Sequence, residues 1–336
     1  MTKKSFIPIP PMAELPEAEE IDVPALVKAY DEGEIDLICV LGPTASGKTR
    51  YAVDLAHHIE EISRLPSVAR NDNVREICKV EIISADSRQV YKGMDIGTGK
   101  DLDEYGEVPY HLIDIAEPGS KYNIFEYQRD FEKAYKEIRE RGRIPILCGG
   151  SGLYIEAATC GYSLPEVPAD PQRRAELEKE DTETLIGMLA ALKPLHNSTD
   201  YDTRKRLIRA IEIAEYQAKH PVKETNFLPK ATYYIGTLVS RDERNAKIDR
   251  RLDARLEEGM VDEIRRLIDS GVKPEDLIYY GLEYKFVTQY VIGELTYEEM
   301  RGQLATAIHQ FAKRQMTWFR GMERKGIKIH WTVNNH

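Results

Sequence analysis

A glycine-rich stretch at residues 42–49 combines the residue types best suited to chemistry. It reads Gly42-Pro43-Thr44-Ala45-Ser46-Gly47-Lys48-Thr49 and fits the pattern G-x-x-x-x-G-K-T. An apolar run precedes it and an amphipathic helical pattern follows it, which is the context that a phosphate-binding loop requires. Its backbone N–H groups and the helix N-terminus can surround a phosphate chain, Lys48 adds a positive charge, and the Thr49 hydroxyl can ligate Mg²⁺. The motif predicts a polyphosphate site, which could hold either a phosphoryl donor or a leaving group.

Asp86 is the second candidate, because it ends an apolar run at residues 80–86. A carboxylate at a strand end beside a phosphate loop can bind Mg²⁺ through water or accept a proton from a nucleophile. The lesser alternative is a structural role, as a helix cap or as an ion pair with Arg88. A third run, 143–148, ends in Gly149-Gly150-Ser151. In parallel sheets, ligands bind outside the carboxyl ends of the strands, so one crevice is expected to collect all three segments.

The order of apolar runs and helical patterns predicts an α/β protein with a P-loop NTPase-like parallel sheet flanked by helices. Expected strands cover residues 37–40, 80–86, 111–115, 143–148, 232–238 and 327–331. Expected helices cover residues 50–62, 125–141, 171–178, 182–192, 203–217, 241–270, 280–292 and 296–323. The later helices form a helical C-terminal part.

Changes in composition divide the chain into three parts. Residues 1–34 are rich in proline and acidic residues and are expected to form a partly disordered N-terminal extension with a helix near 24–32. The core is expected at 35–164 and 201–336. Prolines 165, 168 and 171 introduce a small helical insertion at 165–200.

Composition limits the class of protein. The net charge of −10 excludes a uniformly basic nucleic-acid binder, although basic clusters occur near 204–209 and 313–328. Four cysteines without a C-x-x-C pair suggest reduced thiols in a cytoplasmic protein. The sequence has no apolar run long enough to cross a bilayer and no secretory signal, so no membrane association is expected.

Five segments together resemble the tRNA dimethylallyltransferase (isopentenyltransferase) family. They are residues 42–49, Ile83-Ser-Ala-Asp-Ser-Arg-Gln-Val-Tyr91, Gly93-Met-Asp-Ile-Gly-Thr98, Gly149-Gly-Ser-Gly-Leu-Tyr154 and Ala312-Lys-Arg-Gln-Met-Thr-Trp-Phe-Arg320. The resemblance covers residues 37–331. It implies transfer of a dimethylallyl group from dimethylallyl diphosphate to N6 of the adenosine just 3′ of the anticodon, with tRNA bound through its anticodon arm. The loop would then hold a departing diphosphate together with Mg²⁺, and a monomer would suffice.

The resemblance also assigns roles. Asp86 is the expected general base, Ser151 a donor to the diphosphate, and Lys247 and Arg251 cations that hold it. Residues of the adenine pocket and the RNA-facing helix are expected to be Ser87, Gln89, Tyr91, Lys313, Arg314, Gln315 and Arg320. On that helix Trp318 is expected to point inward and Lys313 and Arg314 outward. The insertion is expected to bind RNA.

The chain departs from the common family pattern at several positions. Ser151 replaces a commoner Thr, and Lys247 replaces a commoner Arg, which keeps the charge but loses the planar fork. Gly281-Leu282-Glu283-Tyr284 stands where Gly-Tyr-Arg or Gly-Tyr-Lys is common, and Ile308-His309 where Thr-Arg is common.

Three other functions remain to be weighed. A transferase with the same chemistry could act on free adenine nucleotides, but it would lack the insertion and the basic C-terminal helix. A small-molecule kinase would need a lid arginine cluster and phosphoryl transfer. A catalytically inactive RNA-binding protein would not need Lys48, Thr49 and Asp86 intact.

Overall fold

The computed structural model describes residues 15–64, 80–161, 167–193, 203–220 and 229–333. The chain divides into two compact units, one formed by Met1–Cys160 with Leu228–His336 and the other by Gly161–Phe227. All the expected catalytic and phosphate-binding residues belong to the first unit, which contains the sheet.

The sheet has six parallel strands in the order β3-β2-β4-β1-β5-β6. The strands are β1 (Leu37–Leu41), β2 (Val80–Ser84), β3 (Tyr110–His111), β4 (Ile144–Gly149), β5 (Thr232–Leu238) and β6 (Ile329–Val333). β1, β2 and β4 are fully buried and consist mostly of β-branched or apolar residues, as strands covered on both faces require. This confirms the predicted parallel α/β architecture.

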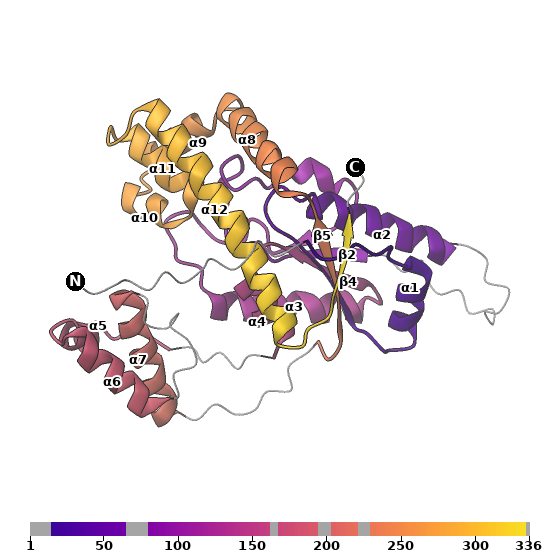
Figure 1. Ribbon diagram of the computed structural model, residues 1–336, viewed down its shortest axis with the longest axis horizontal. Helices are drawn as coiled ribbons and strands as arrows, with labels where there is room; N and C mark the ends of the chain where they lie inside the picture. Colours follow the sequence, from indigo (N-terminus) through magenta and orange to yellow (C-terminus); the bar gives the residue numbers. More distant parts are fainter. Residues whose placement is uncertain (1–14, 65–79, 162–166, 194–202, 221–228, 334–336) are drawn as a thin grey trace, which may run out of the picture. The chain divides into compact units, whose positions relative to one another are not determined.

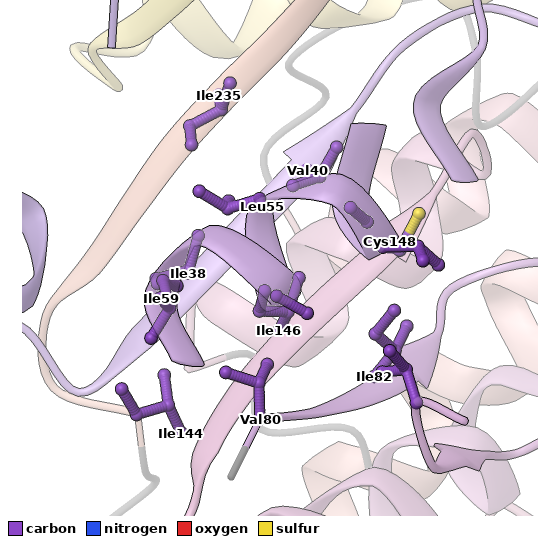
Figure 2. Close-up of a cluster of buried hydrophobic side chains, with 14 of the residues drawn as sticks. Ile38, Val40, Leu55, Ile59, Val80, Ile82, Ile144, Ile146, Cys148 and Ile235 are labelled. Atoms are coloured by element: carbon purple, nitrogen blue, oxygen red, sulfur yellow. The ribbon is translucent and has the colours of Figure 1, made fainter. Parts of the chain in front are cut away.

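Helix α2 (Lys48–Arg64) covers one face of the sheet. Figure 2 shows Leu55 and Ile59 of this helix packed with Ile38, Val40 and Ile146 of the central strands. Successive strand residues point to opposite faces, so the intervening residues of β1 and β4 face the other side. Helix α3 (Ile124–Glu140) contacts β2 and β4 but contributes no residue to this cluster.

The C-terminal part of the first unit is helical. Its members are α8 (Arg241–Glu257), α9 (Met260–Asp269), α10 (Pro274–Tyr279), α11 (Leu282–Val291) and α12 (Tyr297–Arg324). Thr296 caps α12, and Glu299 completes a capping box, which fixes where this long helix begins. In Figure 1, α12 runs from the group formed by α8, α9 and α11 to α4 (Gly152–Thr159), and it contacts α4, α8 and α11.

Two predicted elements differ from the structure, and one helix was not predicted. The helix predicted over 241–270 is two helices, because Gly259 adopts a φ of 103° between α8 and α9. The strand predicted at 111–115 ends at His111, because Leu112 (φ 63°) and Asp114 (φ 56°) lie in the left-handed region. α10 was not predicted. The polar segment near 64–75, whose composition predicts a loop, lies almost entirely outside the described residues.

The described part of residues 1–34 is integrated into the core. Helix α1 (Val23–Asp31) agrees with the helix predicted near 24–32, and it buries Leu26 and Val27 against α2. Upstream of it, Glu19 donates its backbone N–H to the Trp331 carbonyl at 2.7 Å and accepts a side-chain bond from His330 at 2.8 Å. The segment therefore covers the free edge of β6.

A buried carboxylate on β2 stabilises the sheet beside its edge strand β3. Glu81 is 1% exposed, and its carboxylate binds Arg141 at 2.8 Å, His111 at 2.5 Å and also Arg143. Burial alone would raise the pKa of Glu81, but the hydrogen bonds from Arg141, His111 and Arg143 outweigh it and lower the pKa to about 2.

The second unit is a three-helix cluster of α5 (Pro171–Leu177), α6 (Thr182–Leu192) and α7 (Arg204–Lys219). Its core joins Leu177, Leu185 and Leu189 to Leu207, Ile208 and Ile211. α7 belongs to this core, so the unit is wider than the insertion expected at 165–200. The basic cluster near 204–209 is partly neutralised, since Arg204 pairs with Glu178 at 2.9 Å and Arg209 pairs with Glu212.

Candidate active site

The carboxyl ends of β1, β2 and β4 meet at one place. The Ala85 N–H donates to the Cys148 carbonyl at 2.7 Å, and the Ser151 N–H donates to the Ala85 carbonyl at 3.3 Å. A Cβ atom added to Gly150 would lie 3.1 Å from the Gly42 carbonyl and 3.5 Å from the Lys48 Cε. The glycine loop, the Asp86 turn and the 149–151 segment therefore lie next to one another at the carboxyl ends of these strands.

Backbone geometry and one side-chain contact shape the glycine loop. Ala45 (φ 61°) and Gly47 (φ 75°) are both left-handed, a conformation found in backbone loops that form anion-binding nests. The buried Ser46 hydroxyl bonds the Thr237 hydroxyl of β5 at 2.7 Å. Gly42 packs so tightly that an added Cβ would lie 2.2 Å from Thr237 Oγ1, so this position leaves no room for a side chain.

Gln315 of α12 links the glycine loop to the 149–151 segment. Its side-chain oxygen accepts from the Thr44 N–H at 2.8 Å, and its side-chain nitrogen donates to the Gly150 carbonyl at 2.9 Å. Gln315 is only 7% exposed. The prediction that this side chain faces RNA is therefore corrected, because its amide group is occupied in bridging two loops of the site.

Lys48 and Asp86 lie within electrostatic range of each other. Burial lowers the pKa of the Lys48 ammonium, while nearby Cys148 and Asp86 act in the opposite direction. Asp86 Oδ1 accepts from the Arg88 N–H at 2.8 Å, and the Asp86 N–H bonds the Ser84 hydroxyl at 3.2 Å. The carboxylate is half-buried, and within the described residues Oδ2 has no hydrogen-bond partner. Asp86 is therefore oriented by its own turn with one oxygen atom left for a ligand.

The residues that follow Asp86 divide into two groups. Ser87 contacts the site, since its N–H donates to the Ser151 hydroxyl at 3.2 Å. Gln89 and Tyr91 instead hold the structure together. The Gln89 side chain binds Ser84 at 3.0 Å and the Gly99 carbonyl at 3.1 Å. Tyr91 is fully buried and receives a bond from the Tyr122 N–H at 3.0 Å, so the prediction that it forms a wall of the adenine pocket is wrong.

A small pocket opens beside the glycine loop, between α8 and α12. Its lining consists of Thr44, Ala45, Ile248, Arg251, Leu252, Arg255, Glu283 and Ile308. Arg251 was predicted, whereas Arg255 was missed. Lys247, Arg251 and Arg255 follow one another at four-residue intervals, and this spacing on one helix face was the signal available in the sequence.

Asp101 pairs with both pocket arginines. Its carboxylate contacts the Arg251 guanidinium and lies 3.4 Å from that of Arg255. The pKa of Arg255 is lowered, first by burial and then by the neighbouring Arg251 charge. Lys247 pairs with Glu243 at 2.8 Å and is not among the residues that line the pocket. Two cations are thus concentrated beside the glycine loop.

The basic residues of α12 point outward as predicted, but Trp318 does not point inward. Lys313 and Arg314 are exposed and Arg320 is half-buried. Trp318 is 38% exposed, and its ring lies against Gly152, where an added Cβ would be 2.3 Å away. Phe319 fills the buried position instead.

The departures from the family pattern at 282–284 and 308–309 occupy three places. Glu283 and Ile308 both line the pocket. Tyr284 packs against Gly97, and its hydroxyl donates to Glu263 at 2.5 Å. Glu263 also accepts from the N–H groups of Asp95, Ile96 and Gly97 at 2.8–3.1 Å and so anchors the loop over residues 93–99. His309 contacts Asp249 at 2.9 Å, which links α12 to α8.

The donor atoms of the site suit a hard cation. Thr49 and Asp86 supply oxygen atoms, the ligand type that Mg²⁺ prefers. The described residues contain no group of three or more His, Cys, Asp or Glu side chains able to hold a metal by themselves. A cation here would take its remaining ligands from phosphate oxygens and water.

Comparison with known proteins gives consistent results. A family model described as IPP transferase matches residues 89–322. A protein named tRNA dimethylallyltransferase 2, from Bacteroides fragilis, is 54% identical over 302 residues, which cover 89% of this chain and 92% of that protein. A protein named tRNA dimethylallyltransferase 1, from Parabacteroides distasonis, is 55% identical over 300 residues, or 88% and 92% of the two chains.

Solved structures share the fold. The crystal structure of a full-length tRNA isopentenylpyrophosphate transferase from Bacillus halodurans is 33% identical, with a TM-score of 0.60 and 89% of each chain covered. A eukaryotic dimethylallyltransferase structure, 21% identical, matches with a TM-score of 0.67 over 89% of this chain and 74% of that one. Within the described ranges, every helix is too short or too polar to span a lipid bilayer.

Proposed function

This chain belongs to the IPP transferase family, and on that premise we propose that it is a tRNA dimethylallyltransferase. It transfers a dimethylallyl group from dimethylallyl diphosphate to N6 of the adenosine immediately 3′ of the anticodon. The observation that carries this proposal is identity of more than half of the aligned residues to named tRNA dimethylallyltransferases over nearly the whole chain. The convergence of the glycine loop and Asp86 supports the same conclusion.

The glycine loop holds the diphosphate as a leaving group. Transfer breaks the bond between the allylic carbon and a diphosphate oxygen, and that oxygen gains negative charge. We propose that the Lys48 ammonium and backbone N–H groups of the loop, other than those of Thr44 and Ser46, are fixed donors next to that charge, and fixed donors stabilise it without reorganisation. The Ser151 hydroxyl, Arg251 and Lys247 are proposed as further diphosphate contacts. The two hydrogen bonds of Gln315, to the Thr44 N–H and the Gly150 carbonyl, keep the glycine loop and the 149–151 segment aligned.

Asp86 acts as the general base. The exocyclic amine of adenine forms a bond to the allylic carbon and must lose one proton, which Asp86 accepts. Because Oδ1 is held by the Arg88 N–H, the second oxygen atom is available for this proton. Ser87 lies on the same turn and is proposed to contact the adenine.

Mg²⁺ is proposed as the cofactor. Thr49 would hold it, with Asp86 contributing through water and the diphosphate supplying the other oxygen ligands. When bound, it would neutralise charge on the departing diphosphate.

RNA binding is proposed for the exposed residues Lys313 and Arg314 of α12, with Arg320 of the same helix, and for the unit at Gly161–Phe227. An unpaired loop is recognised by charge and by stacking of extruded bases. We further propose that the protein acts as a monomer in the cytoplasm.

An acceptor experiment tests the proposed function. The protein is incubated with labelled dimethylallyl diphosphate, Mg²⁺ and either unmodified tRNA, AMP or ATP. Label on tRNA alone is expected. Label on the nucleotides instead would indicate the free-nucleotide transferase, and ATP turnover without any prenyl transfer would indicate a kinase.

An Asp86→Asn variant tests the base. Its transfer rate is expected to fall by about 10²–10⁴-fold, the usual contribution of general-base catalysis, with donor binding retained. Asp269→Asn, an equivalent exchange at an exposed position of α9, serves as the control and should transfer normally. Undiminished transfer by Asp86→Asn would remove the assignment.

A further inference from the structure

Tyr279, the last residue of α10, is an aromatic residue open to solvent that lies near the side chain of Arg88 in the Asp86 turn. Tyr279 is 49% exposed, which places it among the most exposed large apolar residues that the structure describes. Two cations lie by its ring, since the Arg88 guanidinium carbon is 5.9 Å and the Lys121 Nζ 5.8 Å from the ring centroid. Tyr279, Arg88 and Lys121 are called the Tyr279 cluster below.

Buried neighbours hold the Tyr279 cluster in place. Tyr280 is 1% exposed, packs its ring 4.3 Å from that of Tyr91, and donates its hydroxyl to the Ser120 carbonyl at 2.6 Å. The preceding Tyr279 meets the Tyr280 ring edge-on at 6.0 Å. Since Ser120 precedes Lys121, one buried tyrosine positions both the exposed ring and the loop that carries one of its cations.

Arg88 connects the cluster to the reacting centre. Its backbone N–H binds Asp86 Oδ1 at 2.8 Å, so the side chain that approaches Tyr279 and the carboxylate share one turn. The Arg88 side chain also packs at Gly281, where an added Cβ would lie 3.5 Å from its Nε. The Asp86 turn is therefore linked to this aromatic surface through the Arg88 side chain.

We propose that the Tyr279 cluster is a stacking platform for an unpaired RNA base next to the target adenosine in the sequence. The proposal rests on the function proposed above and assigns part of its substrate contact to residues that the sequence did not identify. An exposed ring stacks on any base, and neighbouring cations neutralise the phosphates that flank it. Tyr91 is fully buried and cannot stack on an RNA base. The chain as a whole is acidic, so the two cations beside Tyr279 stand out as a local positive charge.

Steady-state kinetics with Tyr279→Ala, Tyr279→Phe and wild type test the platform. Tyr279→Ala is expected to raise the KM for tRNA by about 5- to 150-fold, the range for losing one base–aromatic stack, with the KM for dimethylallyl diphosphate unchanged. Tyr279→Phe keeps the ring and should behave like wild type. Tyr297→Ala removes another exposed tyrosine, 40% exposed and at the start of α12, and is the matched control.

A fluorescent base provides a direct readout. An anticodon-arm RNA with 2-aminopurine beside the target adenosine is expected to lose fluorescence on binding wild type and Tyr279→Phe, but not Tyr279→Ala. Lys121→Gln changes only an exposed charge. It should reduce the slope of log affinity against log salt by about 0.7, the value for one single-strand phosphate contact.

The outcomes separate the two proposals. If wild type transfers label to tRNA while Tyr279→Ala matches it in tRNA KM and quenching, the platform is refuted and the proposed function stands. If wild type does not modify tRNA, the proposed function fails. Quenching that persists in Tyr279→Ala but disappears with a different exposed aromatic, such as Trp318→Ala, would also overturn the assignment to Tyr279.

Discussion

Replacing Gln315 with Met tests whether the two loops of the site must be held together. Methionine has a similar length and suits a helix, but it cannot accept from the Thr44 N–H or donate to the Gly150 carbonyl. The side chain is 7% exposed, so little water can replace the lost partners. The substitution therefore removes the bridge between the glycine loop and the 149–151 segment without opening a large cavity.

The size of the effect follows from the two hydrogen bonds. Each neutral bond contributes about 0.5–1.5 kcal/mol net, so losing both removes about 1–3 kcal/mol. Much of this loss should appear as poorer alignment of the diphosphate donors, because both loops belong to the site. A loss of 1–3 kcal/mol from the transition state corresponds to a decrease of about 5- to 150-fold in kcat/KM.

The assay measures kcat/KM for dimethylallyl diphosphate at saturating tRNA, with thermal unfolding in parallel. Gln303→Met, the same exchange at an exposed position of α12, is the control and should change neither quantity appreciably. A Gln315→Met enzyme with unchanged kcat/KM would refute the bridging role. An activity loss fully explained by a lower folded fraction at the assay temperature would also refute it.

Three further predictions concern other contacts. Arg255→Met removes one of the two pocket cations, so it should raise the KM for the diphosphate donor by about 10-fold or more. The KM for tRNA should stay unchanged. Initial rates over a titration of the donor measure the change in KM. Glu263→Gln should lower the free energy of unfolding by about 2–4 kcal/mol and increase hydrogen exchange at residues 95–97, whose N–H groups the carboxylate binds. The pKa of Glu81 is about 2 against an ordinary 4.5, so the ionised carboxylate should stabilise the fold by about 3 kcal/mol above pH 4.5. This stabilisation should be lost as the pH falls from 4.5 towards 2. Urea unfolding of wild type and Glu81→Gln across this pH range checks the prediction, and parallel pH profiles of the two proteins would contradict it.

The sheet and the crevice could be predicted from the sequence because both depend on local patterns. Continuous apolar runs at β1, β2 and β4 indicate buried parallel strands, and a glycine motif or acid directly after each run fixes where the ligand groups emerge. The C-terminal end of β3 was predicted too late in the chain, because the left-handed conformations of Leu112 and Asp114 do not change the hydrophobicity pattern.

The direction of single side chains could not be predicted in the same way. Tyr91, Gln315 and Trp318 were each assigned from the family resemblance, yet the first two are buried and the third is partly exposed. Burial of a tyrosine or glutamine depends on distant partners, here Tyr280 for Tyr91 and the Thr44 N–H for Gln315. Arg255 was missed because a charged residue on a helix is usually solvated, and only its position opposite Asp101 and the glycine loop distinguishes it.

The contact between Glu19 and β6 has a practical consequence for handling the protein. An uncovered strand edge offers unpaired backbone groups to other molecules and promotes association. A shortened version beginning after α1 would expose that edge together with the apolar surface under Leu26 and Val27. An N-terminal truncation made to aid crystallisation should therefore keep the residues from 15 onward, since a larger deletion would promote aggregation.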